Sequence, residues 1–141
     1  MQLRQDLVVI NRYFRQKRQA YMEAYGLKGV HAWYLIAISQ SPGISQDQLA
    51  QKLAVDKSNV ARQVAFLEEN GYLARQASPT DRRVLQLFTT EKADALIEPM
   101  KAESETWENQ LFGLLQPEQL KQLETLLGRL RKAVEEGEVA P

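Results

Sequence analysis

The sequence has 141 residues, 44% of them hydrophobic, which is enough for one globular domain with a buried core. It contains no cysteine, so disulfides, thiolate metal ligands and thiol redox chemistry are excluded. No apolar run approaches the ~18 residues of a membrane-spanning helix, and the first residues do not form a signal peptide. We therefore expect a cytoplasmic protein that does not enter a membrane.

The charge is balanced overall, with 18 basic and 18 acidic side chains, but it is unevenly distributed. Residues 1–30 carry six basic and two acidic side chains, whereas residues 91–141 carry six and eleven. A neutral total argues weakly against a nucleic-acid-binding protein. The acidic excess lies near the C-terminus, however, so the rest of the chain can still present a basic face.

Two helices are predicted in the first forty residues. Apolar residues recur at spacings of three, four or seven from Leu3 to Tyr25, which is the pattern of one face of a long amphipathic helix. A second, apolar helix is predicted over about 31–40. Pro42 and Gly43 follow it and end it, because proline cannot continue a helix and glycine suits a turn.

Two short helices separated by a brief turn come next. Ser45 and Gln48 have the spacing of a capping box, so they predict the start of the first. Asp56 caps the second, which ends at Gly71, a residue that readily adopts the left-handed conformation. The buried stripe of this second helix is Val60, Val64 and Leu67.

A hairpin and two longer helices complete the chain. Strands are predicted over 72–75 and 84–88, around the polar turn 77–83. Thr89 or Thr90 caps the following helix, in which Pro99 predicts a kink or a late start. A break at Gln116-Pro117 precedes the last helix, whose apolar stripe is Leu120, Leu123, Leu127, Leu130 and Val134.

This order of elements predicts a mainly α fold with a small β-hairpin wing. The whole chain, 1–141, is interpreted as a single domain in which residues 31–90 form a winged helix-turn-helix. The stripes of residues 1–25 and 91–135 would leave apolar surface exposed on a monomer, so we interpret these segments as dimerisation helices. The alternative is that the stripes pack only on each other within one chain.

The helix that begins at Asp56 is the candidate recognition helix. Its N-terminal half is the part that enters the major groove of DNA in a helix-turn-helix. Asn and Gln side chains pair with adenine and Arg with guanine, while Lys and Ser suit phosphate oxygens. A solvated polar face would have a similar composition. The side chains predicted to point outward here are Lys57, Ser58, Asn59, Arg62 and Gln63.

The hairpin carries a second candidate site, Asp81-Arg82-Arg83. Arginines on a projecting ribbon suit the narrow, electronegative minor groove. Asp81 is expected to fix the direction of one arginine through a charge-assisted hydrogen bond. The alternative is an ordinary surface ion pair that only stiffens the turn.

These pieces together resemble the multiple-antibiotic-resistance regulator (MarR) family. The matching residues are Asp56-Lys57-Ser58, Arg62, Leu67-Glu68, Gly71-Tyr72-Leu73 and the wing segment 79–83. The resemblance implies a homodimer on double-stranded DNA with a pseudo-palindromic operator. It places Ser58, Asn59 and Arg62 on the recognition helix, Arg83 in the wing, and Asp81 as the partner of that arginine. The family's glycine after the second wing strand is missing here, which leaves the start of the next helix open.

The resemblance also implies a small aromatic or phenolic effector, for which Trp33 and Tyr34 are candidate contacts, although core packing explains both residues as well. We expect a repressor that such an effector releases. The alternative is a winged helix that docks a protein and has no operator. His31 is the only histidine and lacks a nucleophile or metal-ligand partner in the sequence, so no enzyme, cofactor or metal site is expected.

Overall fold

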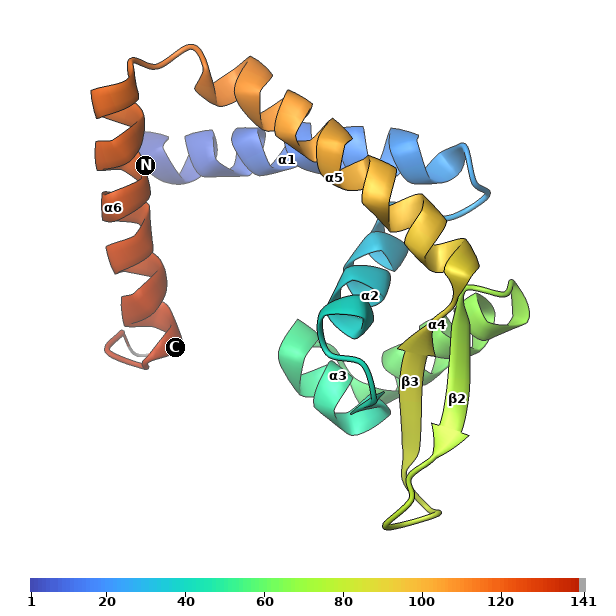
Figure 1. Ribbon diagram of the computed structural model, residues 1–141. Helices are drawn as coiled ribbons and strands as arrows, with labels where there is room; N and C mark the ends of the chain where they lie inside the picture. The colour runs from blue at the N-terminus through green and yellow to red at the C-terminus, as the bar shows by residue number, and fades with distance from the viewer. Residues whose placement is uncertain (140–141) are drawn as a thin grey trace. The chain divides into compact units, whose positions relative to one another are not determined.

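The computed structural model describes residues 1–139. It divides into two compact units, Met1–Glu103 and the residues from Ser104 on, and the boundary falls inside helix α5 (Glu91–Phe112). The predicted mainly helical fold with a small β wing is confirmed (Figure 1). The interpretation of the whole chain as a single domain remains a prediction.

The first unit begins with four helices. They are α1 (Gln2–Glu23), α2 (Gly29–Gln40), α3 (Gln46–Leu53) and α4 (Lys57–Glu69). The predicted capping box is present at the start of α3, where the Gln48 N–H donates to Ser45 Oγ at 3.1 Å and the Ser45 N–H donates to Gln48 Oε1 at 3.0 Å. The turn between α3 and α4 places Ala54 in the left-handed region, with φ 54°.

A three-stranded antiparallel sheet follows the helices. Its strands are β1 (Ile44–Ser45), β2 (Leu73–Ala77) and β3 (Leu85–Thr89), in the order β1-β3-β2. The predicted hairpin is therefore confirmed. The sequence analysis missed β1, because two residues are too short to show alternation.

The core of the first unit fixes the position of α4. Val60, Val64 and Leu67 are fully buried, as predicted, and they pack with residues of α2, α3 and β3. Gly71 ends the α4 segment with φ +80°, a conformation that favours glycine. Helix α4 is thus held on its inner side by the same core that holds the wing.

Helix α5 begins where the predicted threonine cap lies. Thr90 Oγ1 donates to the Gly71 carbonyl at 2.6 Å and accepts the Ala93 N–H at 3.4 Å. The helix then runs through Pro99, so the late start considered for it is wrong. Burial on both sides of the proline explains this, since Ile97 and Met100 are almost fully buried and stabilise the helix there.

The second unit contains the end of α5 and helix α6 (Pro117–Glu135). Pro117 lies in the first turn of α6, where its missing N–H costs nothing. Helix α6 buries no side chain fully, and the C-terminal part of its apolar stripe is exposed: Leu130, for example, retains 57% of its accessible surface, whereas Leu120 and Leu123 are half-buried. Leu3 and Leu7 of α1 are exposed as well. None of the described helices is long and apolar enough to cross a membrane.

Candidate DNA-binding site

Asp56 organises the N-terminus of α4. One of its carboxylate oxygens accepts the Asn59 N–H and the Ser58 hydroxyl, both at 2.7 Å. The Ser58 hydroxyl is the largest contribution that lowers the pKa of Asp56. Because this hydroxyl gives its proton to Asp56, Ser58 can only accept a further hydrogen bond. Of the first two side chains of α4, Lys57 is therefore the one that can donate to an anion.

The lowered pKa of Asp56 predicts a contribution to stability that depends on pH. The native state favours the ionised carboxylate, so this contribution is present above the ordinary aspartate pKa of about 3.9 and is lost as the pH falls below it. We expect Asp56→Asn to unfold at a lower temperature than the wild type at pH 7, with the difference shrinking towards pH 2. Thermal unfolding followed by circular dichroism measures both. A difference that does not change with pH would contradict the assignment.

The outward side of α4 carries the two predicted cations. Arg62 is exposed and forms no ion pair with any residue between 1 and 139. Lys57 lies 3.5 Å from Asp47, but both side chains are more than 70% exposed, so this pair is weak. Both cations are therefore available to an anionic partner.

Gln63 lies differently from the prediction, which had it pointing outward. It is half-buried and faces α2, where its Oε1 lies 2.8 Å from Nε2 of His31. Its Nε2 donates to Asn59 Oδ1 at 3.3 Å. The cause is His31, a buried polar ring that requires a hydrogen-bond partner.

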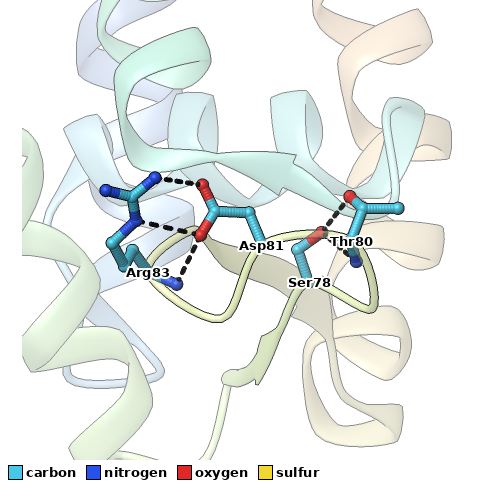
Figure 2. A network of polar contacts seen from close by, with 4 residues as sticks. All are labelled: Ser78, Thr80, Asp81 and Arg83. Atoms are coloured by element: carbon cyan, nitrogen blue, oxygen red, sulfur yellow. Dashed lines mark hydrogen bonds and ion pairs between the residues drawn. The ribbon is translucent and has the colours of Figure 1, made fainter.

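The wing presents Arg83 in a fixed direction. Figure 2 shows the Arg83 guanidinium donating to both oxygens of Asp81, from Nε at 3.1 Å and from Nη2 at 3.2 Å, while the Arg83 backbone N–H also donates at 3.0 Å. The predicted contact between Asp81 and an arginine is therefore present, and it lowers the pKa of Asp81. The Arg83 side chain remains 91% exposed. Arg82 is exposed beside it.

An ion pair that the sequence analysis missed joins the helix to the wing. Arg75 of β2 donates from Nε to a Glu68 oxygen of α4 at 3.0 Å, and both side chains are partly buried. The pair spans seven residues across a turn, so no helical spacing indicated it. It fixes the base of the wing relative to α4.

The two predicted effector contacts do not lie in one site. Trp33 is half exposed and borders a groove between the second half of α1 and the start of α2. The Arg18 guanidinium lies over its ring, 4.2 Å from the centroid. Tyr34, by contrast, is 1% exposed and belongs to the core. Its hydroxyl has no hydrogen-bond partner among the described residues, and burial raises its pKa.

A buried hydroxyl without a hydrogen-bond partner destabilises the folded state, so its removal should not lower the stability of the protein. We expect Tyr34→Phe to fold normally and to unfold at the same temperature as the wild type or at a higher one, because an unsatisfied buried polar group costs about 1–3 kcal/mol. Thermal unfolding of the two proteins at equal concentration measures the change. Clear destabilisation would show that the hydroxyl has a partner, such as a buried water.

The helix pair α3 and α4, followed at once by the β2-β3 wing, defines a winged helix-turn-helix protein. Among the described residues, no group of three or more His, Asp or Glu side chains is placed to hold a metal ion. Residues 25–84 match the model of the MarR family. The chain is 33% identical over 103 residues, 73% of its length and 72% of the relative's, to the HTH-type transcriptional regulator BilQ of Clostridium symbiosum.

Solved structures agree over nearly the whole chain. A crystal structure of MarR is 31% identical, with a TM-score of 0.83, and the match covers 97% of this chain and 95% of that one. FabT of Streptococcus pneumoniae, crystallised in complex with DNA, has the same fold with a TM-score of 0.87 over 96% of each chain, at 19% identity. The chain belongs to the MarR family of transcriptional regulators. Its relatives are named as regulators rather than as enzymes.

Proposed function

We propose that this protein is a sequence-specific DNA-binding transcriptional regulator of the cytoplasm, acting as a homodimer on a pseudo-palindromic operator. The observation that carries the proposal is the pairing of two cationic elements on one unit. Arg62 is exposed on α4 without an ion pair in the described residues, and Arg83 is oriented in the wing by Asp81. The ion pair between Glu68 and Arg75 joins the two elements. The DNA complex of FabT supports it through the shared fold.

The side chains divide the work by their chemistry. Arg62 and Asn59 read base edges in the major groove, where arginine recognises guanine and asparagine forms amide hydrogen bonds. Arg82 and Arg83 enter the minor groove, which attracts arginine when it is narrow. Lys57 binds phosphate, aided by the positive end of the helix dipole, while the Asn59 N–H remains bonded to Asp56.

The exposed stripes of α1 and α6 supply the contact between two copies of the chain. Leu7 and Leu130 are exposed on these helices, and burying such apolar surface is the main favourable term in protein association. A two-fold axis then presents two recognition helices to successive major grooves, ~34–36 Å apart.

Binding to the DNA upstream of the protein's own gene tests the proposal. Fluorescence anisotropy, with random DNA as competitor, should show saturable binding of one dimer per site in the nanomolar range. The affinity should fall steeply with salt, because phosphate contacts release counterions. Weak binding that is equal for both DNAs would contradict an operator at this place, and a winged helix that docks a protein would then be sought by pull-down.

We further propose that the regulator is a repressor released by a small aromatic or phenolic effector that binds beside Trp33. The groove there is lined by four cations, Arg12, Arg15, Arg18 and Lys28, against one acidic residue, Glu23, and none of the cations forms an ion pair within residues 1–139. Burial and the charge of Arg15 lower the pKa of Arg18. An anionic aromatic molecule would relieve this repulsion and stack on Trp33. Tyr34 is buried in the core, so the proposal rests on Trp33.

Trp33 gives this effector proposal an optical readout. We expect a phenolic carboxylate such as salicylate to change the fluorescence of the wild type and to weaken its binding to DNA. In Trp33→Phe the fluorescence of this tryptophan is lost, and we expect release of DNA to need a roughly threefold higher effector concentration, because phenylalanine stacks over a smaller area and makes a weaker cation contact than tryptophan. Trp107→Phe is the control, because it removes the other tryptophan and should keep the response. Equal responses in both variants would place the effector elsewhere.

A further inference from the structure

His31 has one defined tautomer in this structure. The ring is 2% exposed in the first turn of α2, and it stacks on Phe66 with 4.8 Å between ring centroids. Its Nδ1 accepts the backbone N–H of Lys28 at 2.9 Å. A backbone N–H can only donate, so Nδ1 carries no proton, and the neutral ring must carry its proton on Nε2.

This proton sets the direction of two further hydrogen bonds. The Nε2–H group of His31 donates to Gln63, which must therefore turn its oxygen toward the ring, at 2.8 Å. The Gln63 amide nitrogen then faces Asn59 and donates to Oδ1 at 3.3 Å. The Lys28 N–H fixes the tautomer of His31, and the His31 ring then fixes the amide of Gln63. The Gln63 amide in turn fixes that of Asn59. This series of hydrogen bonds begins at a backbone N–H, which cannot exchange donor and acceptor.

We propose that His31 and Gln63 are positioning residues that hold the Asn59 carboxamide with its NH₂ group toward the DNA. This inference rests on the proposed function, since it assumes that α4 reads bases. With Oδ1 engaged by Gln63, Asn59 acts chiefly as a donor. It favours base edges that accept, such as guanine O6 and N7 or thymine O4, over the cytosine N4 amino group.

Burial makes the arrangement hard to reverse. A proton on Nδ1 of His31 would face the Lys28 N–H, so that two donors would point at each other. If the proton moved there from Nε2, the bond to Gln63 would lose its donor; if a second proton were added, the buried ring would become charged. Burial also lowers the pKa of His31, which keeps the ring neutral. The orientation of Asn59 is therefore coupled to the start of α2.

The tautomer can be measured without DNA. His31 is the only histidine in the sequence, so its ring signals are unambiguous in a long-range ¹H–¹⁵N correlation spectrum. We expect the Nε2–H tautomer at neutral pH. The Nδ1–H tautomer, or a mixture of the two, would overturn the inference whatever the DNA-binding result.

The variant Gln63→Glu tests the effect on base preference. A carboxylate still accepts from His31, but it cannot donate, so Asn59 must turn its NH₂ group toward Glu and its oxygen toward the DNA. Sites selected from random DNA by the wild type should prefer guanine to cytosine at the contacted position by about two- to tenfold, the effect of one hydrogen bond. Gln63→Glu should reverse this order. The added negative charge weakens binding to all four bases alike and cancels in the ratio.

Two controls separate positioning from folding. Gln63→Met keeps the length of the side chain without either hydrogen bond, and the preference should shrink without reversing. In Asn59→Ala, the further change Gln63→Glu should no longer alter the base order. Thermal unfolding shows that each variant is folded. If the wild type selects a site and Gln63→Glu prefers the same bases in the same order, the inference about Asn59 is overturned while the proposed function stands. A wild type that selects no site overturns the proposed function as well.

Discussion

Arg62→Ala is expected to lower operator affinity by at least about tenfold and to remove the preference for one base in each half-site. A bidentate pair between arginine and guanine contributes about 1–3 kcal/mol of discrimination, and a homodimer loses it twice. Arg62 is exposed on α4 and forms no ion pair in the described part of the chain, although its charge helps to lower the pKa of Asp56. Competition titrations against operators with single base changes measure both effects.

Arg129→Ala is the matched control for this prediction. It removes the same charge from α6, a helix that is not part of the winged helix-turn-helix. We expect it to leave the base preference unchanged. If Arg62→Ala lowered the affinity for operator and random DNA equally, Arg62 would be a phosphate contact rather than a base contact. Base recognition by α4 would then be assigned to Asn59.

The sequence predicted those parts of the fold that follow from local chemistry. The capping box of Ser45 and Gln48, the cap at Asp56 and the stop at Gly71 each depend on residues within four positions, and all are present. The stripe of α4 was predictable because burial follows the helical period. Strand β1 was not, since its pairing with β3 is decided by tertiary contact.

The residue types of the candidate site could be predicted from the sequence, but the directions of some of its side chains could not. The contact between Asp81 and Arg83 is local, and it was predicted. The position of Gln63 depends on His31, which lies 32 residues away on another helix. A helical wheel places Gln63 at the border between core and solvent, where a distant partner decides its direction. Tyr34 is buried, as the core-packing alternative predicted, whereas Trp33, for which the same alternative was given, is half exposed.

Leu130→Glu is expected to convert the protein to a monomer and to weaken operator binding by about 100-fold or more. Leu130 is 57% exposed on a helix that buries no side chain fully. A charge there would have to lose its hydration in any apolar contact between two copies. A monomer binds only one half-site and loses the gain from simultaneous binding at two, which is commonly about 10²–10⁴-fold. Light scattering measures the mass, and anisotropy measures the affinity.

Gln122→Glu adds the same charge to an exposed position of α6 outside its apolar stripe, and it should leave both mass and affinity unchanged. The comparison also tests the alternative that the stripes are covered within one chain. In that case Leu130→Glu would lower the unfolding temperature while the mass stayed the same. A dimeric mass with full operator affinity in Leu130→Glu would exclude this part of α6 from the interface. The exposed leucines of α1 would then be the next positions to change.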